Sequence, residues 1–282
     1  MLIGVPLALV GVFIWLPTVA SVLLSFTDWD GIGGLDKLRL VGLDNYIQLV
    51  TITPAFWRAL TNNVIWLAGL VVVAMPLGMA IAVALDRPLR GSTFYESAFY
   101  LPVVLSLALV GFIWELQFSP EQGFLNNLLG TTRPDNLIDW LGNRQLNIWA
   151  ALVAASWRHV GYITLIYLAG LRTVDPRLRE AAALDGADEL TTFRKIVFPT
   201  MRPVNVVVLI VTVIEALRAF DVVYILNGGQ NGLELLSVLI VNSLLGEASR
   251  IGFGSAVATI LLLLSIVPIA LYLRRAFRTV TT

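Results

Sequence analysis

Two long apolar runs of this sequence carry ionisable side chains, and charge is costly in such surroundings. The first run holds Arg158 and His159 near its middle, and the second holds Glu215, Arg218 and Asp221. A charge at the centre of a bilayer costs roughly 2.5 to 3.5 kcal/mol on insertion scales, so these groups need a partner or water. They predict either a polar cavity at membrane depth or a set of structural ion pairs between helices.

The spacing of the second set keeps both interpretations open. Glu215 and Arg218 are three residues apart, as are Arg218 and Asp221, which places successive members within side-chain reach along a helix. For Arg158 the cavity is the favoured interpretation. His159 is interpreted as an interior histidine whose hydrogen bonds are satisfied.

Other residue types exclude several chemistries. The two lysines are Lys37 and Lys195, preceded by Asp36 and Arg194, so no Gly-Lys-Ser or Gly-Lys-Thr phosphate-binding loop exists. A single histidine excludes the paired-histidine zinc motif, no G-x-S-x-G nucleophile elbow occurs, and the lack of cysteine excludes thiolate metal sites. We therefore expect no catalytic residue, no metal and no cofactor in this chain.

The composition requires a membrane around the elements that position these residues. Hydrophobic residues make up 57% and charged residues 13% of the 282 residues, and the mean hydropathy of +0.82 lies beyond the range of soluble domains. Lipid offers no hydrogen-bond partners, so helices are expected, about six of them in an all-α membrane protein. The runs long enough to cross a bilayer are Leu2–Phe26, Val64–Leu85, Ala98–Phe118, Asn147–Leu171, Pro203–Leu226 and Ile251–Leu273.

Several details of these runs carry further expectations. The first run lacks a basic leader and a small-residue cleavage site, so a span is favoured over a signal peptide, and the missing leader suggests a trimmed N-terminal tail. Prolines inside spans predict kinks at Pro17, Pro76, Pro102 and Pro268. An aromatic belt at the outer boundary explains Trp29, Trp57, Trp66, Trp114, Trp140 and Trp149.

Charge in the connections predicts the orientation of a single domain over residues 1–282. About eleven Lys and Arg residues lie in one set of connections and about six in the other, and the richer side faces the cytoplasm. Both termini are then cytoplasmic, and connections 27–63, 119–146 and 227–250 face outward. The overall net charge is 0, which suggests neither nucleic acid nor an electrostatically bound partner. The long apolar runs make the lipid bilayer the expected partner.

The cytoplasmic connection 172–202 is much richer in charge than the other connections on that side. Pro176 suits the first turn of a helix, Gly186 permits a sharp bend, and Pro199 is expected to end a second helix. The alanines at 181–183 form a small-residue surface into which a cleft of another protein could close. A solvated linker would rarely combine these three features.

This connection resembles the EAA loop of binding-protein-dependent ABC importer permeases. The residues that carry the resemblance are Glu180-Ala181-Ala182, Asp185-Gly186-Ala187, Phe193, Ile196 and Pro199. One departure is Phe198, where leucine is usual before the proline. Flanking motifs are similar to the sugar-importer branch typified by the maltose and glycerol-phosphate permeases: Trp157 with Gly161, Leu168-Ala169-Gly170-Leu171, Asp175-Pro176, Val41-Gly42-Leu43-Asp44-Asn45-Tyr46, Asp86-Arg87, Arg90-Gly91, Phe220-Asp221 and Gly228-Gly229.

The resemblance implies a type I ABC importer transmembrane fold in the cell membrane of a prokaryote. Its partners would be a second permease subunit, two ATPase subunits that bind ATP and Mg²⁺, and an extracytoplasmic solute-binding protein. The ATPase-coupling residues would be Glu180, Ala181, Ala182, Asp185, Gly186, Ala187 and Pro199. The substrate-path candidates are Trp157, Arg158, Tyr162, Glu215, Arg218 and Asp221, with Trp157 and Tyr162 offering flat surfaces to a sugar ring.

The main alternative is an ion-coupled secondary sugar transporter, which would also use a buried carboxylate such as Glu215. The small number of spans, the lack of an inverted repeat and the presence of a coupling loop disfavour it. The solute stays open between disaccharides, other oligosaccharides, polyols and glycerol phosphodiesters.

Overall fold

The computed structural model describes residues 4–87, 90–246 and 249–278, and this part of the chain is almost entirely helical. Its one isolated β-bridge joins Thr27 and Leu40. The long helical stretches are α1–η1–α2 (Gly4–Val10, Gly11–Trp15 and Leu16–Leu24), α4–η3–α5 (Pro54–Gly69, Leu70–Ala74 and Met75–Leu85), α6 (Ser92–Val104), α7 (Leu107–Phe118), α9 (Asn147–Leu171), α13 (Arg202–Leu217) and α16 (Ile251–Arg278). The short elements are η2 (Leu35–Lys37), α3 (Asp44–Thr51), α8 (Phe124–Leu129), α10 (Pro176–Leu184), α11 (Glu189–Thr192), η4 (Phe193–Val197), α12 (Phe198–Thr200), α14 (Asp221–Asn227) and α15 (Leu236–Leu245).

Length and composition identify three continuous helices in the described residues that can cross a membrane. They are Gly4–Leu24, Pro54–Leu85 and Ile251–Ala270, and a bent pair of helices, 92–104 with 107–118, adds a fourth span if it is counted as one. Helix α9 coincides with the predicted span, and its 25 residues reach roughly 37 Å, enough to cross although charged residues interrupt its middle. The all-α membrane fold is confirmed.

Two of the predicted spans are broken instead of continuous. The predicted span 98–118 bends by 100° between α6 and α7, because Leu105 is extended and the hydroxyl of Ser106 caps α7 by accepting from the Leu109 N–H. The predicted span 203–226 ends as a helix at Leu217, and α14 begins only at Asp221. Both breaks leave short half-helices at the same end of the molecule.

Three prolines within helical stretches are accommodated by π-helical turns, whereas Pro102 and Pro268 lie inside the α-helices α6 and α16 without such a turn. The turns η1, η3 and η4 each end two residues before a proline, at Pro17, Pro76 and Pro199. A proline lacks an N–H and its ring meets the carbonyl four residues earlier, and in all three cases that carbonyl lies within the π turn. The expectation that Pro199 ends its helix is therefore wrong, since the helix continues to Thr200.

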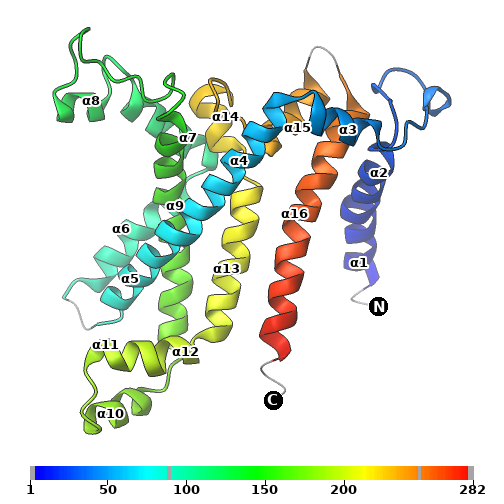
Figure 1. The fold of residues 1–282 in the computed structure, drawn as a ribbon. Coiled ribbons are helices and arrows are strands. Elements are labelled where there is room, and N and C mark those ends of the chain that lie inside the picture. The colour runs from blue at the N-terminus through cyan, green and yellow to red at the C-terminus, as the bar shows by residue number, and fades with distance from the viewer. Residues whose placement is uncertain (1–3, 88–89, 247–248, 279–282) are drawn as a thin grey trace.

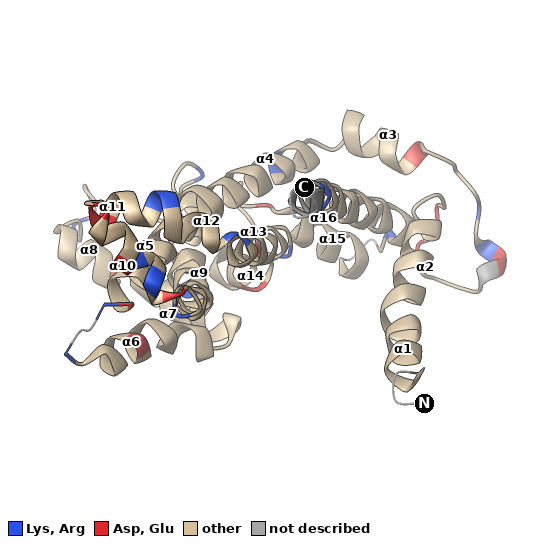
Figure 2. Cartoon of the chain, turned by 90° about the horizontal axis from the view of Figure 1, so that it is seen from below, with Lys and Arg blue, Asp and Glu red and all other residues tan. Residues whose placement is uncertain are grey.

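The arrangement of the ends agrees with the orientation predicted from charge (Figure 1). The start of α1, the end of α16 and the helices α10 and α11 lie at one end of the molecule, and α3, α8, α14 and α15 lie at the other. Seen from below, α10 and α11 lie in the part of the view where charged residues gather, and α1 stands to one side of the bundle (Figure 2). The predicted connection 227–250 is not a simple loop, because it contains the apolar helix α15, with Leu236 and Val238 fully buried.

Helix α9 contributes to two of the three hydrophobic clusters of the core. Its first half packs with α7, α14 and the region of Trp66, and its second half packs with α5 and with Val197 and Met201 near the coupling-loop end. The outer-loop motif at 41–46 is structural: the Asn45 side chain donates to the carbonyls of Ser25 and Thr27 at 2.9 and 2.8 Å and so ties α3 to the end of α2.

Candidate functional site

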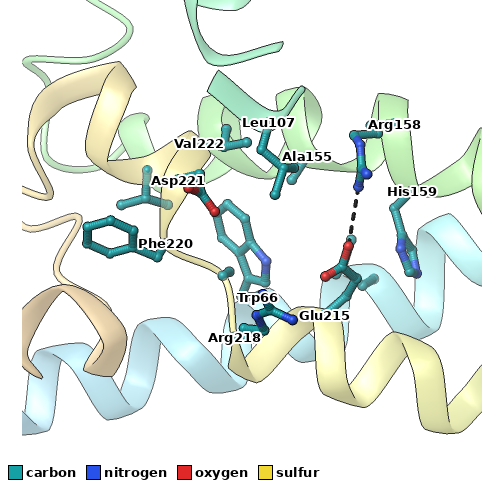
Figure 3. Close-up of a pocket in the computed structure, with 13 residues that line it drawn as sticks. Trp66, Leu107, Ala155, Arg158, His159, Glu215, Arg218, Phe220, Asp221 and Val222 are labelled. Carbon is teal, nitrogen blue, oxygen red and sulfur yellow. Dashed lines mark hydrogen bonds and ion pairs between the residues drawn. The ribbon is translucent and has the colours of Figure 1, made fainter. Parts of the chain in front are cut away.

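A cavity of about 270 Å³ lies where the two broken spans meet α4 and α9 (Figure 3). The starts of α7 and α14 and the end of α13 all contribute to its wall. Its polar lining comes from five residues: Arg158, His159, Glu215, Arg218 and Asp221. The structure therefore brings the ionisable residues of the two apolar runs to one place.

An ion pair crosses from α9 to α13 in the wall of this cavity. Arg158 Nη1 lies 3.2 Å from Glu215 Oε1, and the two side chains are 23% and 35% exposed. The partner of Glu215 is thus Arg158 and not Arg218, which lies beyond the last residue of α13 and is exposed to solvent. This ion pair between two helices also lines the cavity.

His159 is an interior histidine with a hydrogen-bond partner, as predicted. It is buried, and its Nε2 lies 3.0 Å from Oγ1 of Thr212 on α13, with the donor set by the tautomer. Together with Arg158 it joins α9 to α13 at two successive positions. The described residues contain no cluster of His, Asp and Glu side chains that could hold a metal ion.

The aromatic residues at the cavity are not the ones predicted. Trp66 and Phe220 line it, whereas Trp157 and Tyr162 do not. Trp157 lies next to Arg158 on α9 and so points about 100° away around the helix, where its ring meets Trp114 edge to face. Tyr162 lies one turn nearer the cytoplasmic end and packs against the core between α5 and α9.

Trp66 was predicted to belong to the aromatic belt at the outer boundary, and this prediction is wrong. Trp66 is buried in the core, while Trp57 and Trp149 are half exposed near the outer end. The helix that carries Trp66 begins at Pro54, ten residues before the predicted start of the span, so Trp66 lies several turns inside it. Thr53 and Pro54 are a helix-start signal that the sequence analysis did not use.

The cytoplasmic loop is a pair of helices fixed by local capping. The Asp175 carboxylate accepts from the Arg177 N–H, with Pro176 in the first turn of α10. Gly186 takes φ of +77°, and the N–H groups of Gly186 and Ala187 donate to the carbonyls of residues 183 and 182 at 3.1 and 2.9 Å. This is the glycine-terminated helix end that the sequence predicts, and it turns the chain into α11.

The second helix of the loop begins at Asp188. Its carboxylate accepts from the Thr191 N–H at 3.1 Å, and hydrogen bonds from Thr191 hold the pKa of Asp188 below its usual value of 3.8. The group is solvent-exposed, and its charge stabilises the start of α11.

The alanines at 181–183 do not form one open surface on α10, as the sequence analysis predicted they would. Ala182 is only 3% exposed and packs within this chain, so it is not part of a surface open to another protein. Leu184, which the sequence analysis missed, is 90% exposed. The open face of the helix repeats at spacings of three and four residues: Arg177, Glu180, Ala181 and Leu184. Of the other predicted coupling residues, Asp185 and Pro199 are exposed and Ala187 is partly buried.

Comparisons with known proteins extend over nearly the whole chain. Residues 8–279 match the family described as binding-protein-dependent transport system inner membrane component. The chain is 33% identical over 276 residues to the xylose/arabinose import permease XacH of Haloferax volcanii, covering 96% of this chain and 85% of that protein. It is 30% identical over 264 residues to the trehalose/maltose permease MalF of Thermococcus litoralis, covering 92% and 87%.

The same fold occurs in a solved structure. A chain of the bacterial alginate ABC transporter, crystallised in complex with an alginate pentasaccharide-bound periplasmic protein, superposes with a TM-score of 0.81 at 20% identity, covering 100% of this chain and 94% of that one. At this identity the likeness concerns the fold alone.

Proposed function

Because this chain belongs to the family of binding-protein-dependent transport system inner membrane components and is a permease subunit of an ABC importer, we propose that it carries an uncharged sugar or a closely related small hydrophilic solute. Curated relatives that match over most of the chain are named for xylose and arabinose and for trehalose and maltose. Those solutes are neutral and rich in hydroxyl groups. The cavity offers hydrogen-bonding groups for such molecules.

The observation that carries the proposal is the balanced polar lining of the 270 Å³ cavity. Arg158 and Arg218 supply two positive charges and Glu215 and Asp221 supply two negative charges. Guanidinium groups donate hydrogen bonds and carboxylates accept them, so the set can serve both roles of a sugar hydroxyl. The rings of Trp66 and Phe220 add the flat apolar surface on which a sugar ring packs.

The cytoplasmic loop supports the second half of the proposal, which is coupling to an ATPase. The loop projects at the end of the molecule where the termini lie, and its exposed face combines Glu180, Ala181 and Leu184 (Figure 1). We expect this face to enter a groove of an ATPase subunit, with Leu184 as its apolar anchor. ATP and Mg²⁺ would be bound by two such ATPase subunits, because this chain has no phosphate-binding loop.

The remaining partners follow from the open side of the cavity. Arg218 and Asp221 line the cavity and are exposed in the isolated chain, so a second permease subunit would complete the path around them. An extracytoplasmic solute-binding protein would deliver the solute to the outer end, where α3, α8 and α15 lie. The permease would then form the transport path. The binding protein would supply selectivity, and the ATPase subunits would supply energy.

The proposal is tested by reconstituting the complex in proteoliposomes with its binding protein. Xylose, arabinose, maltose and trehalose are compared with alginate oligosaccharides and glycerol phosphodiesters as stimulants of ATP hydrolysis. We expect stimulation by one or more of the neutral sugars and none by the acidic solutes. Stimulation by acidic solutes alone would contradict the substrate class, and solute uptake by this chain alone would contradict the importer mechanism.

Thiol labelling tests the cavity itself, because the chain has no cysteine of its own. Single cysteines at 158, 215 and 218 are expected to react with membrane-impermeant thiol reagents in at least one transport state. A cysteine at Ala154, which is fully buried in the core on α9, is the unreactive control. Protection of all three cavity positions in every state would show a closed ion-pair network and no solute path.

A further inference from the structure

The cytoplasmic loop is tied to the end of α5 by an ion pair that no part of the proposed function uses. Asp86 follows the last residue of α5, and its Oδ2 lies 2.8 Å from Arg179 Nη1 on α10. The Asp86 side chain is 14% exposed and that of Arg179 is 40% exposed, so the pair is partly shielded from water. Arg179 lies on the inner face of α10, opposite the exposed face of Glu180, Ala181 and Leu184.

A second ion pair runs beside the first. Arg87 pairs with Glu189 on α11, but these side chains are 59% and 81% exposed. Exposed ion pairs contribute little because water and salt screen them, whereas a partly buried pair keeps more of its attraction. The pair formed by Asp86 is therefore the stronger connection, and the pair formed by Arg87 is a natural comparison.

The space around these pairs is open. A cavity of about 790 Å³ lies between the end of α5, the end of α9 and the loop, and all four charged residues line it. Apolar packing joins the base of the loop to α5 through Val197, Ala82 and Leu85, but α10 itself reaches the end of α5 across this cavity by way of Arg179. The ion pair is thus a direct bridge from the exposed coupling helix to α5.

The bridge leads to the solute cavity along one helix. Asp86 ends the continuous helical stretch 54–85, and the same stretch carries Trp66 and Leu70 into the wall of the 270 Å³ cavity. The stretch stays one helix although the π turn η3 and Pro76 interrupt its regular hydrogen bonding, so a displacement of its end can reach residues several turns away.

We propose that Asp86 and Arg179 are positioning residues that transmit movement of the coupling helix to Trp66 and the solute cavity. The proposal rests on the proposed role of the loop in ATPase coupling. When an ATPase shifts α10, Arg179 draws or releases the end of α5, and the wall of the cavity moves with it. Loss of the pair then separates ATP hydrolysis from solute movement while leaving the ATPase attached.

The test measures solute transported per ATP hydrolysed in the reconstituted complex, at matched permease abundance. Asp86→Asn and Arg179→Gln are expected to lower this ratio about tenfold, equivalent to about 1.4 kcal/mol of lost coupling, with the ATPase still co-purifying. The exchange Asp86→Arg with Arg179→Asp is expected to restore much of the ratio, because the pair is re-formed with its charges reversed. The double variant Asp86→Asn/Arg179→Gln leaves no lone charge and should fold even where a single variant does not.

The matched control is the neighbouring exposed pair. Arg87→Gln and Glu189→Gln are expected to change the ratio less than about twofold, since exposed pairs contribute little. A wild-type ratio in Asp86→Asn/Arg179→Gln, or equal losses in the control pair, would overturn the proposal. Absence of solute-stimulated hydrolysis or of ATPase attachment in the wild-type complex would instead overturn the proposed function.

Discussion

The loop 172–202, for which we propose ATPase coupling, and the 270 Å³ cavity, for which we propose solute binding, are both built on interruptions of helices. These interruptions are held in different ways. In the loop, each break is satisfied by residues next to it: Asp175 and Asp188 cap the two helix starts and Gly186 closes the end between them. At the cavity, Ser106 caps the start of α7 locally, but the break after Leu217 is bridged by Ser237, whose hydroxyl donates to the Ala219 carbonyl from another part of the chain.

The half-helices at the cavity are likewise held by distant contacts. Gly111 of α7 packs against Ile225 of α14, and Arg158 pairs with Glu215 across 57 residues of sequence. A locally satisfied turn keeps its shape when its surroundings move, whereas a break held by tertiary contacts changes when those contacts change. The loop is therefore suited to move as a unit, and the cavity is suited to change shape.

The largest effect is expected from removing one partner of the cavity ion pair. Glu215→Ala leaves the Arg158 charge in the wall of the cavity without its partner, and we expect a loss of about 2 kcal/mol in the free energy of unfolding, below the ~3 to 5 kcal/mol of a fully buried pair. Because both groups are lost together, the double variant with Arg158→Ala should be destabilised less. Thermal unfolding in detergent measures this, and additive losses would show that the two residues do not interact.

A comparable effect is expected where α7 meets α14. A Cβ at Gly111 would lie 2.8 Å from the Ile225 side chain, so Gly111→Ala must displace that chain and is expected to lower stability by about 1 to 3 kcal/mol. Transport should fall while ATPase attachment is unchanged. Ile225→Ala removes Cγ2, the atom nearest to the added methyl group, so Gly111→Ala should cost less in the Ile225→Ala background than in the wild type. An equal cost in both backgrounds would count against the contact.

Two neighbouring alanines of α10, the buried Ala182 and the exposed Ala181, are expected to respond differently to the same substitution. Ala182→Leu places a larger side chain in a buried position and is expected to cost about 1 to 2 kcal/mol of stability. Ala181→Leu changes the exposed face, and we expect unchanged stability but weaker ATPase attachment. Equal behaviour of the two variants in thermal unfolding would show that the faces of α10 are not distinct.

Local chemistry in the sequence predicts the loop better than it predicts the cavity. Pro176 and Gly186 act on the backbone within one turn, so their effects can be read without the rest of the fold. The partner of Glu215 depends on how α9 and α13 are rotated, which is set by packing along both helices. The depth of Trp66 depends on a helix start at Pro54, in a stretch too polar for the hydropathy of the predicted span.

A smaller effect is expected at the bend itself. A Cβ at Gly186 meets no neighbouring atom, so only the positive φ of +77° opposes a side chain there. Gly186→Val is expected to lower stability by about 1 to 2 kcal/mol, while Gly186→Asn, which tolerates this conformation, should cost less. Solute-stimulated ATP hydrolysis should fall in the valine variant. Normal coupling in that variant would show that the bend is not required.

The smallest effect is expected from titration of Asp188. Because the pKa of this carboxyl is lower in the folded protein than its usual value of 3.8, its charged form stabilises α11 at higher pH, and that contribution is lost as the pH falls through the lowered pKa. Hydrogen-exchange protection of the Thr191 amide, measured between neutral pH and about pH 3 and corrected for the intrinsic exchange rate, should decrease at the acid end.

The control variant keeps the hydrogen bond that caps α11 but removes the negative charge. Asp188→Asn keeps a side-chain oxygen that can accept from the Thr191 N–H but has no group that titrates in this range. Its protection should therefore be independent of pH where the wild-type protection falls. If the asparagine variant loses protection at the same pH, the loop is responding to a distant group, and its breaks are not satisfied locally. The contrast with the cavity would then fail, because both regions would depend on tertiary contacts for their shape.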